Sequence, residues 1–180
     1  PGDDGIEFWE YVADKGVRVI MLTNSLASNN HIPVHAAYAR YRHRLIQSGI
    51  ELHEMRVNAI DIPEDDEESD FESVTLHTKA IMVDRRFTFI GSLNLDPRSI
   101  DINTEMGMLI RSPELVAQMT ERAAENIATI AYRLELDEKD KIVWRATVDG
   151  EEIVETKEPQ TTAWQRFTAW FLKVLPENQL

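Results

Sequence analysis

Hydrophobic positions in the first third of the chain follow first a helical and then a strand period. Residues 6–14 have apolar spacing typical of a helix, and the β-branched run at residues 17–24 is typical of a buried strand. Pro33 can open a second helix over residues 35–48, and residues 50–57 then alternate as a strand does. This part of the sequence predicts the order helix, strand, helix, strand.

Three more strands are predicted after an acidic stretch. Residues 63–72 carry like charges that repel one another and offer little to bury, which indicates a solvated loop. Residues 73–84 alternate and then become continuously apolar, two arginines provide a turn, and residues 87–94 form the next strand. Residues 103–110 are the third strand of this group.

The last part of the chain is predicted to hold two helices and a hairpin. A long helix begins at a proline and covers residues 113–134. Residues 141–148 and 151–156 flank an Asp-Gly pair, which suits a two-residue hairpin turn, and residues 161–175 form a last, aromatic-rich helix. Together the elements predict an α/β fold with a mixed β-sheet flanked by helices, ending in a hairpin and a helix.

Length and composition indicate a folded globular protein, since 180 residues with 43% apolar content can bury one core. We expect a main domain over residues 1–136 and a hairpin-and-helix extension over residues 137–180. No run of 18 consecutive apolar residues occurs, and the first residues have no basic and then apolar pattern. We therefore expect neither a transmembrane helix nor a signal peptide.

Charge and cysteine content exclude several classes of function. The chain has 19 basic and 32 acidic side chains and a net charge of −13, the opposite of the basic surface that nucleic-acid binding requires. It has no cysteine, which excludes disulfides, thiolate metal sites and a cysteine nucleophile. We expect no nucleic-acid partner, no metal and no cofactor.

The chemistry is indicated by His77, Lys79 and Asp84, which form the pattern HxK(x)4D on a predicted strand. Because side chains alternate along a strand, His77 and Lys79 are expected on one face. An imidazole can attack phosphorus or move a proton near neutral pH, and an ammonium group can neutralise the non-bridging oxygens of a phosphate. The pair therefore suits a phosphodiester substrate, although a His and a Lys on a strand are more often ordinary surface residues.

Four further residues at fixed spacing strengthen this hypothesis. Gly91, Ser92 and Asn94 follow Asp84 closely, and Glu105 comes eleven residues after Asn94. With the HxK(x)4D pattern, these positions resemble the phospholipase D superfamily, also called the HKD family after its motif. The resemblance implies one half of the pseudo-dimeric fold of that family.

The resemblance also implies a role for each residue. His77 would be the nucleophile or the general acid/base, Lys79 and Asn94 would bind the phosphate, and Ser92 would support it. An acidic residue at the position of Glu105 would hydrogen-bond the histidine, fixing its tautomer as in a triad.

Two motif residues are assigned structural roles. Asp84 is seven positions from His77, which is roughly 23 Å along a straight strand, so we expect it to end the strand rather than to touch the substrate. Gly91 suits a close approach of two backbones. Read singly, Ser92 and Asn94 can each cap a turn.

The segments that flank the motif residues indicate which group of the superfamily the chain resembles. Residues 23–30, 34–42 and 91–107, and the last helix, look like the C-terminal part of bacterial cardiolipin synthases. This implies transfer of a phosphatidyl group to phosphatidylglycerol, with phosphatidylethanolamine as a possible donor, through a phosphohistidine intermediate. It also implies a peripheral position on the cytoplasmic side of the bacterial membrane.

The sequence departs from that family in carrying a single HxK(x)4D motif where such enzymes have two. One histidine cannot complete a cycle in which one His binds the phosphoryl group and another moves protons. We expect the partner to be an N-terminal HKD half of the same parent chain or a second copy. With the second motif here, His77 would be the general acid/base.

Three residues are second-tier candidates. Asn24 and Ser25 follow a predicted strand, where open α/β sheets gather ligand groups, although a capping or turn role is equally compatible. His35 opens a helix and can reach a phosphate pocket or be a packed residue.

Two surface features remain open. The arginines at positions 40, 42 and 44 are expected on a solvated helix face, with contact to anionic headgroups as the alternative. The aromatic side of the last helix suits a membrane interface and burial against the other half equally well.

A hydrolytic phospholipase, a nuclease and a non-catalytic lipid-binding domain are the rival functions.

Overall fold

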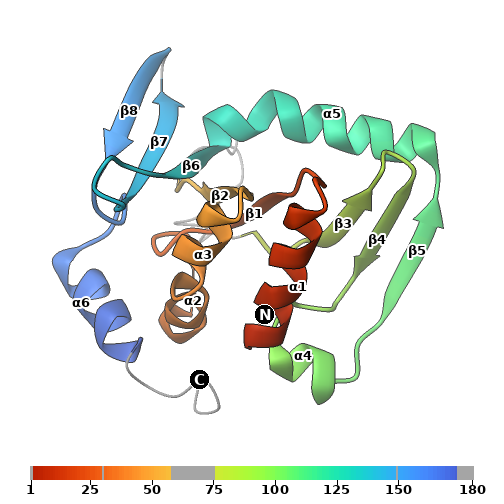
Figure 1. Ribbon diagram of the computed structural model, residues 1–180, viewed down its shortest axis with the longest axis horizontal. Coiled ribbons are helices and arrows are strands. Elements are labelled where there is room, and N and C mark those ends of the chain that lie inside the picture. The colour runs from red at the N-terminus through yellow and green to blue at the C-terminus, as the bar shows by residue number, and fades with distance from the viewer. Residues whose placement is uncertain (1, 30, 58–75, 149, 174–180) are drawn as a thin grey trace, which may run out of the picture. The chain divides into compact units, whose positions relative to one another are not determined.

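The computed structural model describes residues 2–29, 31–57, 76–148 and 150–173, which fall into two compact units (Figure 1). One unit comprises Pro1–Phe8 and His77–Ile127, and the other comprises Trp9–Leu76 and Ala128–Leu180. The predicted α/β class, with a mixed sheet flanked by helices and a closing hairpin and helix, is confirmed. The predicted acidic loop at residues 63–72 lies outside the described residues.

The unit that carries the motif contains a three-stranded antiparallel sheet. Its strands are β3 (Lys79–Val83), β4 (Phe87–Gly91) and β5 (Gly107–Arg111), which lie side by side in Figure 1. Each strand is shorter than predicted. The region before β5 lies outside the strand, and the side chains of Asn103 and Glu105 and the amide of Met106 make polar contacts there.

Two helices follow β4 and β5. The short α4 (Pro97–Asp101) is capped by Asp96, whose side chain accepts a hydrogen bond of 2.8 Å from the Ser99 amide. The long α5 begins at a proline as predicted and covers Pro113–Ile130. The predicted extension of this helix to residue 134 is wrong, because the chain turns directly into strand β6 (Ala131–Leu136). Ala131, Tyr132 and Leu134 of β6 are buried in a sheet, and this burial outweighs the helical propensity of the segment.

The other unit is built on a five-stranded mixed sheet in the order β1-β2-β6-β7-β8. Strands β1 (Ile20–Asn24) and β2 (Glu51–Met55) are parallel, whereas β6, β7 (Ile142–Val148) and β8 (Glu151–Glu155) add antiparallel pairs. The predicted hairpin is confirmed, with Val148 paired to Glu151 and a positive φ of 83° at Gly150. The predicted domain boundary after residue 136 falls between β6 and β7 and stays a prediction.

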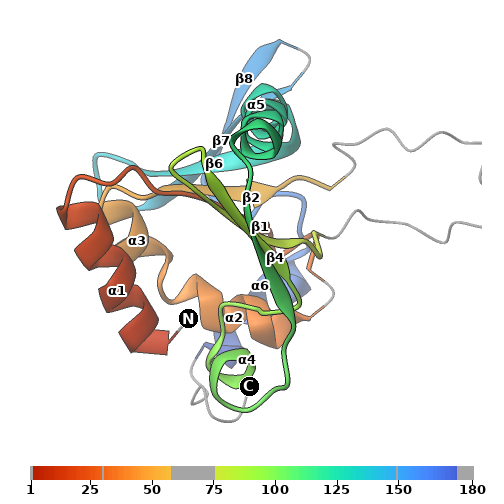
Figure 2. The same ribbon diagram turned by 90° about the vertical axis from the view of Figure 1, so that its right-hand side faces the viewer.

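Helices α2 (Ile32–Ala39), α3 (Arg42–Gln47) and α6 (Ala163–Leu172) flank this sheet, and α1 (Gly2–Asp14) opens the chain. Helix α3 packs on β2 and β6, and α6 lies beside α2 in Figure 1 and Figure 2. The single helix predicted at residues 35–48 is two helices. Between them the amide of Tyr41 bonds the carbonyl of Tyr38, three residues back, which tightens the turn and ends α2.

The predicted solvated arginine face is wrong for Arg42, which is 2% exposed. Its Nη1 donates a 2.7 Å hydrogen bond to Glu158, and its Nε lies 2.9 Å from Glu54 in an ion-pair contact. Arg42 Nη2 also contacts the ring of His35, which is 1% exposed. Two carboxylates thus draw this arginine into the core, because a buried charge needs a partner.

The buried carboxylate of Glu54 has two more donors. Tyr38 donates from its hydroxyl at 3.0 Å, and Trp144 donates from its indole nitrogen at 2.9 Å. Burial first, and then the charge of Glu54, hold the pKa of Tyr38 well above its usual range. The guanidinium of Arg42 lies over both aromatic rings, 5.2 Å from that of Tyr38 and 5.5 Å from that of Trp144.

We predict that this cluster makes the fold sensitive to acid. Burial alone would raise the pKa of Glu158, but the His35 hydrogen bond and the Arg42 charge outweigh it and lower that pKa to about 2. The pKa of a glutamate in an unfolded chain is about 4.3. The ionised carboxylate of Glu158 therefore stabilises the fold fully above about pH 5, and this contribution is lost as the pH falls towards 2.

Urea unfolding at pH 7 and pH 3 tests this. The free energy of unfolding of the wild type should fall on acidification by more than that of Glu158→Gln, which has no carboxylate to protonate at this position. An equal fall in both proteins would contradict the prediction.

Candidate functional site

The candidate site lies at one end of the three-stranded sheet. Lys79, Gly91 and Gly107 form one row across β3, β4 and β5. Because neighbouring strands run in opposite directions, β3 begins, β4 ends and β5 begins at this row. Segments that enter or leave the sheet there bring together residues that are far apart in sequence.

His77 precedes β3 by two residues, rather than lying within a strand as predicted, and its side chain meets that of Lys79. Lys79 Nζ lies 3.1 Å from both ring nitrogens of His77 and donates a 2.9 Å hydrogen bond to its backbone carbonyl. His77 is exposed and Lys79 is half-buried. The pair therefore presents an imidazole and an ammonium group together to an incoming anion.

Close packing at the same row requires glycine. A Cβ on Gly91 would lie 2.5 Å from the carbonyl oxygen of Met106, and a Cβ on Gly107 would lie 2.2 Å from the ring of Phe89. The two glycines let the Phe89 ring lie against the sheet and let β4 and β5 approach closely. The amide of Ser92 can then donate a 2.8 Å hydrogen bond to Met106 O, which fixes the backbone just beyond Gly91.

Ser92 and Glu105 are joined across this end of the sheet. Ser92 Oγ donates to Glu105 Oε2 at 2.5 Å and accepts a 3.0 Å hydrogen bond from the amide of Met106. Asn103 Nδ2 lies 3.4 Å from the other carboxylate oxygen of Glu105. The role expected of Glu105, to hydrogen-bond His77, stays a prediction, because the hydrogen bonds described for its carboxylate come from other partners.

These donors keep Glu105 charged. The hydrogen bond from Ser92 makes the largest contribution to lowering the pKa of Glu105, with further lowering by Ser99, Asn103 and the charge of Lys79. Ser99 and Asn103 were not among the residues selected from the sequence. The small polar residues just before Glu105, in the segment RSIDINTE, were the signal that could have identified them.

Asn94 and Asp84 do not belong to the row formed by Lys79, Gly91 and Gly107, and they lie in different parts of the unit. Asn94 is exposed, three residues beyond the end of β4 and before α4. Asp84 lies in the β3–β4 turn at the opposite end of the hairpin, with a φ of 53°, a value that aspartate tolerates better than most residues. Asp84 directly follows the last residue of β3, and the strand-ending role expected for it stays a prediction.

We predict that Ser92→Ala shifts the pH dependence of activity. Loss of the hydroxyl removes the main cause that lowers the pKa of Glu105, so the acidic limb of the kcat/KM profile should move to higher pH. The loss of a charge-assisted hydrogen bond should also lower kcat/KM by about tenfold at neutral pH. Ser112→Ala, which removes the Oγ that accepts from the Leu115 amide at the start of α5, is the matched control, and its profile should stay unchanged.

The second-tier candidates belong to the other unit. Asn24 clamps the backbone of Leu76, accepting from its amide at 2.7 Å and donating to its carbonyl at 2.9 Å. Ser25 is buried and forms a turn with Ser28 through hydrogen bonds of 2.9 and 3.1 Å. His35 lies in the cluster around Arg42. Asn24 thus holds the residue that immediately precedes His77 along the chain.

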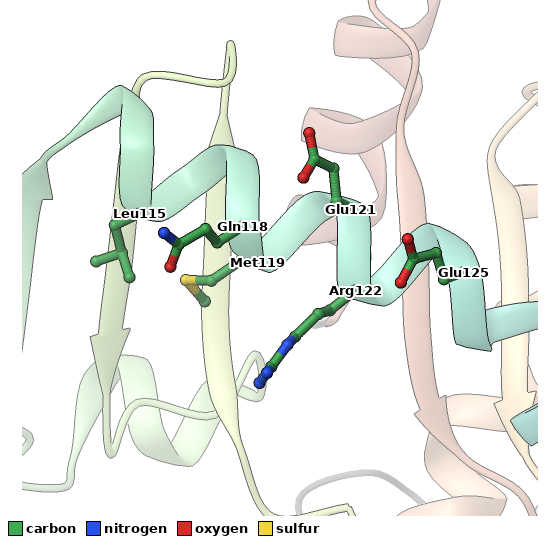
Figure 3. A pocket seen from close by; sticks show the side chains of 6 residues that line it. All are labelled: Leu115, Gln118, Met119, Glu121, Arg122 and Glu125. Atoms are coloured by element: carbon green, nitrogen blue, oxygen red, sulfur yellow. The ribbon is translucent and has the colours of Figure 1, made fainter.

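A hollow on α5 shares no residue with this site (Figure 3). It is lined by side chains of one helix: Leu115, Gln118, Met119, Glu121, Arg122 and Glu125. Among the described residues, no group of three or more His, Asp or Glu side chains is placed to hold a metal ion. Within the same ranges, no helix has the length and apolar character needed to cross a membrane.

The sheet end with its His-Lys pair and its Ser-Glu pair fits the class of phospholipase D-like domains. Comparison with known proteins gives the family: the model described as "Cardiolipin synthase, PLD-like domain" matches residues 8–127. The chain belongs to this family.

Curated relatives agree with that assignment. The chain is 36% identical over 174 residues to "Cardiolipin synthase C" of Escherichia coli (strain K12), a match covering 92% of this chain and 36% of the relative. It is 33% identical over 184 residues to an "Uncharacterized protein" of Helicobacter pylori (strain J99 / ATCC 700824), covering 100% of this chain and 35% of that protein. The chain thus spans about a third of the length of these relatives. No solved structure matches it significantly.

Proposed function

We propose that this chain supplies one histidine half of a phospholipase D-type phosphatidyl transferase, which makes cardiolipin from phosphatidylglycerol and a second phospholipid. The observation that carries the proposal is the position of Lys79 Nζ, 3.1 Å from both ring nitrogens of His77, at the sheet end that also holds Ser92 and Glu105. The name of the Escherichia coli relative supports the choice of product.

The proposed reaction has two steps and uses a second histidine from a partner half. In the first step a nitrogen of the partner histidine forms a bond to phosphorus while the bond from phosphorus to the leaving alcohol breaks, and His77 gives the leaving oxygen a proton. In the second step His77 takes a proton from a hydroxyl of phosphatidylglycerol, whose oxygen bonds to phosphorus as the phosphorus–nitrogen bond breaks.

In this proposal the other residues bind the phosphate or stabilise the charged groups that take part in the reaction. Lys79 and Asn94 bind the non-bridging phosphate oxygens, and Lys79 offsets the negative charge that builds on them. Ser92 holds Glu105 in its ionised form, and Glu105 stabilises the imidazolium form of His77. No metal or cofactor takes part. The reaction would take place at the cytoplasmic side of the bacterial membrane.

Lipid products test the proposal directly. The complete protein is given phosphatidylglycerol with and without phosphatidylethanolamine, and the products are followed by mass spectrometry. Cardiolipin that appears in the wild type and disappears in Lys79→Ala supports the transferase. Phosphatidic acid as the sole product would replace the transferase with a hydrolase, because water would then be the acceptor.

A further inference from the structure

Helix α6 presents an aromatic face that the described part of the chain does not cover. Trp164, Phe167, Trp170 and Phe171 are 73%, 52%, 62% and 55% exposed. The opposite side of the helix packs on α2 and buries Ala169. These four positions are spaced by three, three and one residues, so they lie on one side of the helix.

The aromatic face is ordered rather than a set of independent side chains. The rings of Trp164 and Phe167 stack with centroids 5.8 Å apart, and those of Phe167 and Trp170 are 6.1 Å apart. A capping box fixes the start of the helix, with hydrogen bonds in both directions between Thr162 and Gln165. Little conformational entropy would therefore be lost when this face binds.

Residue type and local charge identify the occupant. Tryptophan and phenylalanine on one side of a helix that lies along a surface are typical of the lipid–water interface. Residues 157–173 contain three basic side chains, Lys157, Arg166 and Lys173, and one acidic side chain, Glu158, in a chain whose net charge is −13. The carboxylate of Glu158 is already paired with Arg42. The helix is thus a locally basic, aromatic segment of an acidic protein.

We propose that the aromatic face of α6 docks into the interfacial layer of a bilayer that contains anionic phospholipid, with the helix lying in the membrane plane. The inference goes beyond the proposed chemistry, because α6 holds none of the residues assigned to catalysis. The same face also fits burial against a protein partner, and the experiment below separates the two.

Vesicle binding of the complete protein tests the proposal. Co-sedimentation with phosphatidylglycerol/phosphatidylethanolamine vesicles should show a partition coefficient at least about tenfold lower for the double variant Trp164→Ser/Trp170→Ser than for the wild type. The matched control is Phe8→Ser/Tyr11→Ser, which removes two aromatic side chains of α1 that are 56% and 59% exposed, and which should bind like the wild type. Binding should weaken with added salt and with vesicles of phosphatidylcholine alone.

Two further measurements make each outcome decisive. Vesicles of brominated lipid should quench the fluorescence of the wild type more than that of Trp164→Phe/Trp170→Phe, which keeps the apolar face and should keep binding. His77→Ala should bind vesicles like the wild type, so that loss of activity and loss of docking are told apart. Unchanged vesicle binding by Trp164→Ser/Trp170→Ser would overturn the proposal, and an altered oligomeric state or a lower urea midpoint of that variant would then indicate a protein contact instead.

Discussion

His77→Ala should lower the rate of phosphatidyl transfer by about 10²–10⁴-fold, because it removes the proposed general acid and base of both steps. The measurement is kcat for cardiolipin formation by the complete protein in mixed lipid vesicles. The loss should appear in kcat more than in KM, since Lys79 and Asn94 remain to bind the phosphate.

A second histidine on the same chain provides the control. His43 on α3 is 37% exposed and pairs with Asp140 at 3.0 Å, and it has no assigned role in the reaction. His43→Ala should leave kcat within about twofold of the wild type, as surface substitutions usually do. Equal losses in both variants would indicate a general effect on folding, and no loss in His77→Ala would remove His77 from the mechanism.

Arg42→Met should destabilise the fold by about 3–5 kcal/mol, because it leaves the buried carboxylates of Glu54 and Glu158 without their cation. Glu54 has a side chain that is 0% exposed and Glu158 one that is 16% exposed. The free energy of unfolding is measured in urea from tryptophan fluorescence, to which Trp144, lying against the guanidinium group, contributes.

Arg44 on the same helix is the matched control. It pairs with Glu10 at 2.8 Å, but its side chain is 42% exposed, so solvent screens the interaction. Arg44→Met should therefore change the free energy of unfolding much less than Arg42→Met. The triple variant Arg42→Met/Glu54→Gln/Glu158→Gln should recover part of the loss, since no unpaired charge is then buried. If Arg42→Met and Arg44→Met were equally stable, the cluster would not hold the fold together.

Local signals allowed most of the elements to be predicted from the sequence. The Asp-Gly turn, the start of α5 at Pro113 and the last helix, whose capping box of Thr162 and Gln165 the structure shows, depend on residues within a few positions of one another. Such signals do not require knowledge of the rest of the fold. Strand β6 was missed for the opposite reason, because its place between β2 and β7 is set by residues distant in sequence.

For the candidate site, too, some features could be predicted from the sequence and others required the structure. The spacing of His77, Lys79, Ser92, Asn94 and Glu105 was sufficient to select them, because a resemblance to a known motif depends on order along the chain. Their surroundings required the structure. Ser99 and Asn103 reach Glu105 because α4 folds back at the end of the sheet, and no periodic pattern in the sequence shows that contact.

By itself the sequence determined the class of fold and the resemblance to a family, and it selected the residues proposed to carry the chemistry, because periodicity, capping and motif spacing are local properties. The tertiary structure alone decided that Arg42 is a buried cation, since its partner Glu158 lies 116 residues away and only the packed core brings the two together. It likewise decided that the aromatic face of α6 points away from α2, because which side of a helix is buried depends on the surface it packs against.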